Sequence, residues 1–332
     1  MPASRIVDPT AANINVAADM LRRGELVAFS TETVYGLGAD ALSAAAVGRI
    51  FAAKGRPANH PLIVHISDAS ELTHWATDVP NGAIKLAEAF WPGPLTMILR
   101  RGRNVLDELT GAQATIGLRI PAHPVALKLL RRFGSGIAAP SANRFGQVSP
   151  TTAAHVAEGL GDRVGLILDG GPCAIGIESS IVDLTGTLPR LLRPGMLSRA
   201  AIEEVLGTAL DRDNSSAPRV SGSLESHYAP RTPVRWLSAD AILKALKHEA
   251  GRLATGVIAL EDQPVDAMAA AQWRNLSADP DAYAHELYAQ LRELDALKLD
   301  LILLEIPPDT AEWEAVRDRL QRAAGGHNAG KP

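Results

Sequence analysis

The chain has 332 residues, which is long enough for two domains with separate hydrophobic cores. Its 46% hydrophobic residues and net charge of −4 are ordinary for a soluble globular protein, and no run of about 18 uncharged apolar residues predicts a membrane span. A single cysteine, Cys173, excludes an internal disulfide and, together with a first segment unlike a signal peptide, predicts a cytoplasmic protein.

Residues 1–206 alternate helical and strand patterns, beginning with a helix over 10–23 that Gly24 ends. Many strands with short connections predict a mixed α/β sheet rather than a regular doubly wound one. The predicted strands are 26–29, 62–66, 95–99, 115–120, 136–139, 165–168, 180–184 and 190–192, and the further helices are 43–53, 81–90, 124–133, 151–159 and 198–206.

The regular pattern gives way to Asp, Asn, Ser, Pro, Gly and Arg over residues 207–232, which is typical of a linker. This linker ends in His227 and Tyr228, large side chains that could cover a ligand, so we expect it to act as a lid. A smaller Rossmann-like α/β domain with a parallel sheet is predicted over 233–325. Its predicted strands are 234–237, 256–260 and 299–304, and its helices are 239–249, 281–294 and 310–323.

Residues 326–332 are expected to be a frayed tail. The segment from Gly325 to Lys331 has the spacing of a phosphate-binding P-loop, but it follows a helix and has no Ser or Thr after the lysine. Gly36 and Gly38 give only half of a dinucleotide-binding pattern, in a polar segment over 30–38 that is expected to be a loop.

Two cations, Lys54 and Arg56, stand two residues apart in a Gly/Pro turn before the apolar strand 62–66. Lysine supplies a mobile point charge and arginine a planar fork, and such a pair suits a polyphosphate. Taken alone, the pair could be two ordinary surface charges. Four other polar strand ends carry matching chemistry, however: the hydroxyl-rich segment 30–38, Arg119, the pair Ser141 and Asn143, and Ser179 with Arg193.

Each of these residues could be explained singly by loop capping or by a buried salt bridge. Together they predict a ligand crevice at the strand ends of an open α/β sheet. The sequence contains no Ser-His-Asp order, no paired carboxylates and no metal-binding spacing. It therefore favours a site that positions substrates and neutralises charge, as in phosphoryl and nucleotidyl transfer.

Five segments resemble the YrdC-like, threonylcarbamoyl-AMP synthase family: Thr31-Glu32-Thr33-Val34-Tyr35-Gly36-Leu37-Gly38, Lys54-Gly55-Arg56-Pro57 with Pro61-Leu62-Ile63-Val64-His65, Trp91-Pro92-Gly93-Pro94-Leu95-Thr96, Ala139-Pro140-Ser141-Ala142-Asn143 and Leu192-Arg193-Pro194-Gly195. The linker motif His227-Tyr228-Ala229-Pro230 is similar to that of the longer, two-domain form. The resemblance implies a twisted mixed-sheet catalytic domain over 1–206, followed by the linker and the second domain.

The resemblance also implies a reaction in which L-threonine, bicarbonate and ATP give threonylcarbamoyl-AMP and pyrophosphate. A downstream transferase complex would then modify tRNA, and Mg²⁺ is expected with ATP although no protein ligand is identified. Lys54 and Arg56 would be catalytic. The residues implied to surround ATP are Lys54, Arg56, His60, Thr115, Ser141, Asn143, Ser149, Arg193, His227 and Tyr228. Those implied to contact threonine are Thr33, His65, Arg119, Ala139 and Ser179.

Two positions depart from the family pattern. His60 replaces the usual Asn, which leaves its ATP contact open, and Ser180 replaces the usual Thr but keeps the hydroxyl. The competing hypothesis is a binding module for double-stranded RNA or tRNA that binds nucleotide incidentally. Clustered arginines at positions 100, 101 and 103 would serve it, although the net charge of the chain argues against it.

Overall fold

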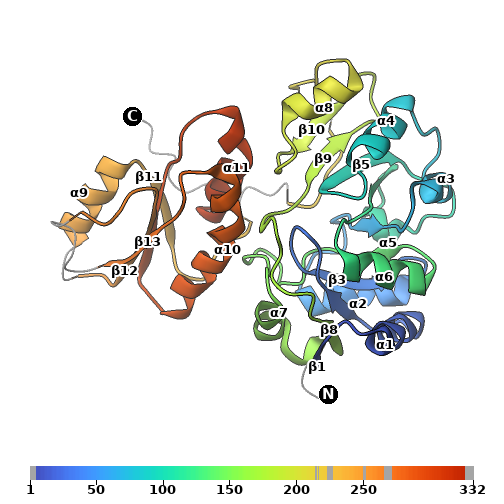
Figure 1. Cartoon of the computed structure of the whole chain (residues 1–332), viewed down its shortest axis with the longest axis horizontal. Coiled ribbons are helices and arrows are strands. Elements are labelled where there is room, and N and C mark those ends of the chain that lie inside the picture. Colours follow the sequence, from blue (N-terminus) through green and yellow to red (C-terminus); the bar gives the residue numbers. More distant parts are fainter. Residues whose placement is uncertain are drawn as a thin grey trace. The chain divides into compact units, whose positions relative to one another are not determined.

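The computed structural model describes residues 5–213, 215, 217–222, 227–249, 252–264 and 271–325, so the predicted tail 326–332 lies outside the described residues. The chain forms two compact units (Figure 1). The first comprises Met1–Phe145 and Ser149–Ser223, and the second comprises Gly146–Val148 and Leu224–Pro332. Most of the predicted linker therefore belongs to the first unit and only its end to the second.

The first unit contains a ten-stranded mixed sheet in the order β1-β8-β2-β3-β7-β4-β6-β5-β9-β10, as the predicted fold class requires. Its strands are β1 Arg5–Val7, β2 Val27–Phe29, β3 Gly36–Asp40, β4 Ile63–His65, β5 Leu95–Arg100, β6 Thr115–Arg119, β7 Ile137–Ala138, β8 Leu166–Leu168, β9 Ser180–Asp183 and β10 Arg190–Arg193. Its helices are α1 Ala11–Arg22, α2 Ala44–Lys54, α3 Leu72–Trp75, α4 Asn81–Phe90, α5 Asp107–Thr110, α6 Pro124–Phe133, α7 Ala153–Leu160 and α8 Arg199–Leu206.

The strand pairings place the ends of β4 and β6 side by side. These two strands run parallel, with His65 in register with Arg119. β6 pairs antiparallel with β5, and β5 pairs parallel with β9, so that Leu95 lies opposite Ser180. Because the sheet mixes both directions, polar residues that follow or precede different strands can meet at one edge.

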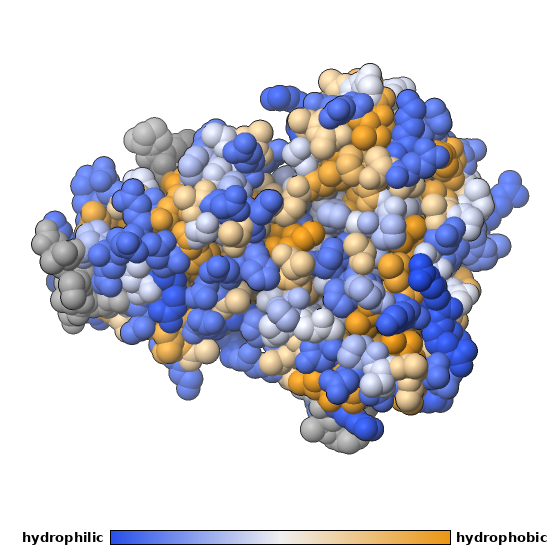
Figure 2. Space-filling view, in the orientation of Figure 1, coloured by the Kyte–Doolittle hydropathy of each residue, from blue (hydrophilic) through white to orange (hydrophobic). Residues whose placement is uncertain are grey.

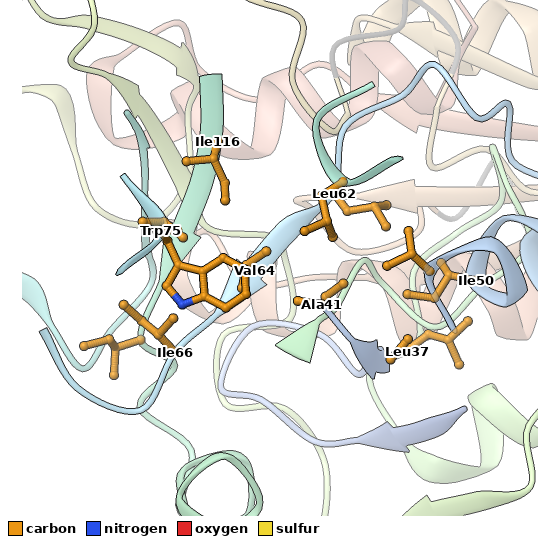
Figure 3. Packing of buried hydrophobic residues seen from close by; sticks show 14 of the residues in the cluster. Leu37, Ala41, Ile50, Leu62, Val64, Ile66, Trp75 and Ile116 are labelled. Atoms are coloured by element: carbon orange, nitrogen blue, oxygen red, sulfur yellow. The ribbon is translucent and has the colours of Figure 1, made fainter. Parts of the chain in front are cut away.

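The core around β4 and β7 fits closely (Figure 3). Trp75 and Val64 are buried there, and a Cβ on Gly136 would lie 2.4 Å from the Trp75 ring and 2.7 Å from Val64. Any side chain at position 136 would therefore push β7 away from β4. This packing holds in place the loop after β7, which carries Ser141 and Asn143.

The prediction of a loop throughout 30–38 is wrong, because Gly36–Asp40 forms β3. β3 pairs antiparallel with β2, and a Cβ on Gly38 would lie 2.9 Å from the ring of Phe29. The glycines of the half dinucleotide pattern thus serve close packing within a sheet. Strands β1 and β13 (Ala271–Asn275) and the short helices α3 and α5 were also not predicted from the sequence pattern.

The second unit has a four-stranded sheet in the order β11-β14-β12-β13, and its pairings are all parallel, which confirms the predicted sheet. Buried apolar residues from α9, β12 and β14 form its core, including Leu246, Val257 and Leu303. The elements other than β13 are β11 Val234–Leu237, α9 Ala239–Glu249, β12 Thr255–Ala259, α10 Pro280–Ala296, β14 Leu301–Glu305 and α11 Glu314–Ala323.

Hydrophilic and hydrophobic residues are interspersed over the face shown in Figure 2. The large hydrophobic side chains that are exposed among the described residues come from separate elements, and they are Ile6, Val16, Leu42, Ile84, Leu188, Leu297 and Ile306. Within the described part of the chain, no helix is both long and apolar enough to cross a membrane.

Candidate functional site

Lys54 is the last residue of α2, and Gly55 ends that helix in the left-handed conformation with φ +64°. The Lys54 side chain is buried, and its Nζ donates to the backbone oxygens of Ser141 at 2.5 Å and Asn143 at 2.7 Å. Burial holds the pKa of Lys54 well below its ordinary value; the charge of Arg56 lowers this pKa further, and Glu178 opposes the shift. The lysine thus ties the cationic turn to the loop after β7.

Arg56 is also buried, which contradicts the alternative of a solvated surface turn. Its Nη2 donates to the backbone oxygen of Pro61 at 2.9 Å and to Ser221 Oγ at 3.2 Å. The guanidinium lies 5.6 Å from the centre of the Phe145 ring, and the His60 ring packs edge-on against the same phenyl ring. Burial and the nearby arginines lower the pKa of His60, so this histidine is neutral at ordinary pH.

Arg193, at the end of β10, is the third buried cation of this region. Its Nε and Nη2 donate to the backbone oxygen and Oγ of Ser179, at 3.0 and 3.2 Å. Its Nη1 donates to the backbone oxygen of Ser221 at 2.9 Å. Ser221 is thus hydrogen-bonded to both Arg56 and Arg193, so two predicted phosphate-binding arginines share one partner in the structure.

Ser221 belongs to a segment of the predicted linker that packs on the first unit. Arg219 donates its backbone N–H to Gln113 Oε1 at 2.8 Å. Val220 is buried in a small apolar cluster with Ile98 and Ile181 of the large sheet. The first part of the predicted linker therefore has fixed contacts and covers part of the sheet.

Arg119 ends β6 and lies at the centre of the predicted threonine site. Its Nε donates to the backbone oxygen of Gly93 at 3.2 Å, and its Nη1 donates to Thr33 Oγ1 at 2.9 Å. Its Nη2 lies 2.7 Å from Oε1 of Glu32, and both side chains are nearly buried. The anionic partner that an arginine in so apolar a strand requires is therefore Glu32.

His65 is buried beside Arg119, its register partner on β4. Burial lowers the pKa of His65 well below its ordinary value, and the charge of Arg119 lowers it further, so the imidazole is neutral. The backbone N–H of Ala139 donates to the oxygen of Ile63 at 3.0 Å. Ser179 Oγ lies 2.8 Å from Thr96 Oγ1 and also accepts from Arg193.

The remaining predicted ATP residues of the first unit lie on neighbouring elements. Ser149 Oγ donates to Glu178 Oε1 at 2.6 Å, and Glu178 acts electrostatically on Lys54. The Asn143 amide nitrogen donates to the backbone oxygen of Arg144 at 2.8 Å. Thr115 begins β6, four residues before Arg119, so both side chains point to the same face of the sheet. β6 therefore carries one residue of the predicted ATP set and one of the predicted threonine set, about 13 Å apart along the strand.

His227 and Tyr228 belong to the second unit, whose own side chains pack against them. Tyr228 is buried with φ +59°, and its ring lies 5.3 Å from the Arg319 guanidinium and 5.8 Å from the ring of Tyr288. The His227 ring lies 4.1 Å from that of Tyr228. The contacts of His227 and Tyr228 with ATP stay a prediction.

The two predicted ligand sets of the first unit meet at Ser179. This serine, which the resemblance assigns to threonine, is in direct contact with Arg193, which it assigns to ATP. Lys54, Arg56 and Arg193 are the buried basic side chains of the predicted ATP set, and Arg119 with its hydroxyl and carboxylate partners belongs to the predicted threonine set. Such an arrangement can hold a polyphosphate next to a small zwitterion.

Sequence reasoning missed four residues that complete these contacts: Glu32, Thr96, Glu178 and Ser221. Glu32 carried a usable signal, because an acidic residue in a loop between two buried strands needs a partner. Ser221 carried none, because it meets Arg56 from a position 165 residues away.

Cys173 is buried, and burial raises the pKa of its thiol to about 12, which suits a small apolar side chain better than a nucleophile. Within the described ranges, no group of three or more His, Cys, Asp or Glu side chains could hold a metal ion.

Two family models match the chain. Residues 19–195 match the model described as telomere recombination, and residues 197–325 match the model for the C-terminal domain of threonylcarbamoyl-AMP synthase. Together they span nearly the whole chain.

Individual relatives agree with the family models. Threonylcarbamoyl-AMP synthase of Bacillus subtilis is 41% identical over 319 residues, which cover 93% of this chain and 92% of that protein. The synthase of Halorhodospira halophila is 34% identical over 154 residues, covering 46% of this chain and 81% of that shorter protein. The crystal structure of Pyrococcus abyssi Sua5 in complex with L-threonine superposes with a TM-score of 0.89 at 38% identity, covering 97% of this chain and 98% of that one.

Proposed function

This chain belongs to the threonylcarbamoyl-AMP synthase family, and we propose that it converts L-threonine, bicarbonate and ATP into threonylcarbamoyl-AMP and pyrophosphate, as a nucleotidyltransferase. The observation that carries this proposal is the direct contact between Ser179 and Arg193. It brings a residue that the resemblance assigns to threonine against one that it assigns to ATP, as a reaction between an amino acid and a nucleotide requires.

The proposed chemistry has two steps. The free amine of threonine attacks the carbon of bicarbonate, water leaves, and a carbamate forms. A carbamate oxygen then attacks the α-phosphorus of ATP, and pyrophosphate leaves. The side chains of this site would mainly position the reactants and neutralise charge, because Lys54, Arg56, Arg193 and Arg119 are basic groups suited to the phosphates and to the threonine carboxylate.

Lys54, Arg56 and Arg193 would bind the phosphates and stabilise the negative charge that grows on departing pyrophosphate. Arg119 would hold the threonine carboxylate with its planar fork. Because carbamates hydrolyse readily in water, a cover over the site has a chemical reason, and we assign this role to the end of the linker with His227 and Tyr228.

Mg²⁺ would accompany ATP and neutralise part of the triphosphate charge. The buried cations of the site suit the phosphates themselves rather than a metal ion, so we expect water and phosphate oxygens to supply most of its ligands. The product would be consumed by a transferase complex that modifies tRNA, since an acyl adenylate of this kind is reactive and needs an acceptor.

Pyrophosphate release is expected to require both L-threonine and bicarbonate. Purified chain, ATP and Mg²⁺ are incubated with each substrate alone and with both, and pyrophosphate is measured with a coupled phosphatase. L-Serine, which lacks the threonine methyl group, is the matched control and should give a lower kcat/KM. Equal release with serine, or none with threonine in bicarbonate buffer, would contradict the proposal.

ATP binding is expected to take up a proton at Lys54. The pKa of this lysine is lowered in the free protein by burial and by Arg56, and a neighbouring triphosphate would raise it again. Between these two pKa values binding consumes one proton, so the affinity for ATP should fall as the pH rises through that interval. Below the free-protein pKa of Lys54 no proton is taken up and the affinity should be constant.

Titration calorimetry in buffers of different ionisation enthalpy measures this uptake directly, above about pH 7.5 where the ATP phosphates are already deprotonated. Lys54→Arg is the control, because its guanidinium keeps its charge throughout and the uptake should vanish. An equal proton count in the wild type and this variant would assign the uptake to another group.

A binding module for double-stranded RNA or tRNA remains the second candidate, but the described contacts do not favour it. Of the arginines at positions 100, 101 and 103 that suggested it, Arg101 pairs with Asp107. This ion pair occupies one of the cations that would otherwise face a phosphate backbone.

A further inference from the structure

Glu32 is a buried carboxylate within the proposed threonine site, and only 8% of the residue is exposed. Its loop is held firmly. Thr31 Oγ1 donates to the backbone oxygen of Val34 at 2.6 Å and accepts from the N–H groups of Thr33 and Val34. The backbone oxygen of Glu32 accepts from Ile175 N–H at 2.8 Å. The position of the carboxylate is therefore set by the fold.

The carboxylate of Glu32 is incompletely satisfied. Its Oε1 lies 2.7 Å from Arg119 Nη2, but the two atoms do not meet with hydrogen-bond geometry. Among the described residues, neither Oε1 nor Oε2 of Glu32 accepts a hydrogen bond, and Arg119 Nη2 donates none. A buried ion normally gains several hydrogen bonds that offset the loss of water, so this pair has capacity for a further partner.

The nearby His123 does not supply a second positive charge to neutralise Glu32. Burial lowers the pKa of His123 below its ordinary value, so this histidine is neutral at ordinary pH, although Glu32 opposes the shift. Cys173, which also lies near the carboxylate, is protonated and uncharged. The charge available to Glu32 from the described residues is therefore that of Arg119, which the substrate carboxylate would share.

An α-amino acid supplies what this pair lacks. Its carboxylate and ammonium groups are attached to the same carbon. Because Arg119 Nη2 and the Glu32 carboxylate lie side by side, a bound zwitterion can place its carboxylate at Arg119 and its ammonium at Glu32. A hydroxy acid or a plain carboxylic acid would satisfy Arg119 but leave Glu32 as a buried charge next to an added negative charge.

We propose that Glu32 binds the ammonium group of the amino-acid substrate on entry, before that group loses the proton that the carbamate step requires, and selects an α-amino acid over acids that lack the amine. This assignment rests on the proposed function, because it takes threonine as the occupant of the site. The ammonium has three N–H groups, so it can donate to both unsatisfied oxygens of the Glu32 carboxylate.

Titration calorimetry with two ligands tests the assignment. L-Threonine carries the amine, and 3-hydroxybutanoate is the same acid with hydrogen in its place. In the wild type, threonine should bind at least about 10-fold more tightly. Glu32→Gln keeps the size and polarity of the side chain but removes its charge, and it should weaken threonine binding about 10- to 150-fold. The same variant should bind 3-hydroxybutanoate at least as tightly as the wild type does, because Arg119 still holds the carboxylate and the repulsion from the Glu32 charge is removed.

The outcomes separate the alternatives. If Glu32→Gln weakens both ligands equally, Glu32 only orients Arg119 and the assignment is overturned. If the variant binds threonine as the wild type does, the assignment is also overturned. Should the variant not fold, the comparison of both ligands in the wild type still decides, since equal affinities would overturn it. A wild type that binds no threonine at all would instead refute the proposed function, which a loss confined to the variant would not.

Discussion

Arg56→Ala is expected to lower the rate of pyrophosphate release about 10- to 150-fold, because one charged hydrogen bond to the leaving group is lost. The reason is chemical rather than structural. The guanidinium is buried beside Lys54 and Arg193, where it would face the phosphates. The rate is measured under saturating threonine, bicarbonate and ATP.

The controls separate catalysis from folding. Arg56 packs on Phe145 and bonds to Pro61, so thermal unfolding of the variant must be compared with the wild type. Arg103→Ala removes an exposed arginine of the same unit and should leave the rate unchanged. A folded Arg56→Ala protein with normal activity would show that this arginine only packs the turn.

Arg119→Lys is expected to raise the KM for threonine about 10- to 150-fold while changing the KM for ATP less than about 3-fold. Arg119 contacts Thr33, Gly93 and Glu32 through three different nitrogens, and a lysine has one nitrogen and no planar fork. The measurement is a steady-state titration of each substrate with the other two saturating.

Thr33→Ser is a matched control, because it keeps the hydroxyl that accepts from Arg119 and should keep most of the affinity for threonine. Similar increases in both KM values for Arg119→Lys would show that the arginine supports the whole sheet edge. Such a result would refute the assignment of Arg119 to the threonine site.

The parts of the fold that could be predicted are those with a long, unambiguous pattern. α4 and α6 were predicted to the residue, since each combines apolar periodicity with a clear boundary, such as Gly134 after α6. β3 could not be predicted, because glycines at positions 36 and 38 disfavour a strand locally. The glycine at position 38 is explained by its close contacts with Phe29, Ile137 and Val27 on the neighbouring strands, which are distant in sequence or hidden from the local pattern.

The same division holds for the candidate site. Lys54 and Arg119 stand out in the sequence, because charges in apolar surroundings require partners. Their actual partners could not be predicted. Lys54 binds two backbone oxygens of a remote loop, and backbone oxygens carry no sequence signal. The environment of Ser179 likewise depends on Thr96, which lies 83 residues away.

The position of Ser221 between Arg56 and Arg193 has a consequence for how a nucleotide arrives and leaves. Both arginines donate hydrogen bonds to this neutral residue. The hydroxyl and carbonyl oxygens of Ser221 therefore stabilise two neighbouring positive charges in the absence of phosphate. A triphosphate that binds these arginines as we propose would displace these contacts, and its net affinity would be the difference between the two sets of partners. Binding is then an exchange of ligands at the arginines, and when pyrophosphate departs the serine can return to the same two groups. A site organised in this way can hold a highly charged molecule and still release its product, because the two arginines keep hydrogen-bond partners after the product has left.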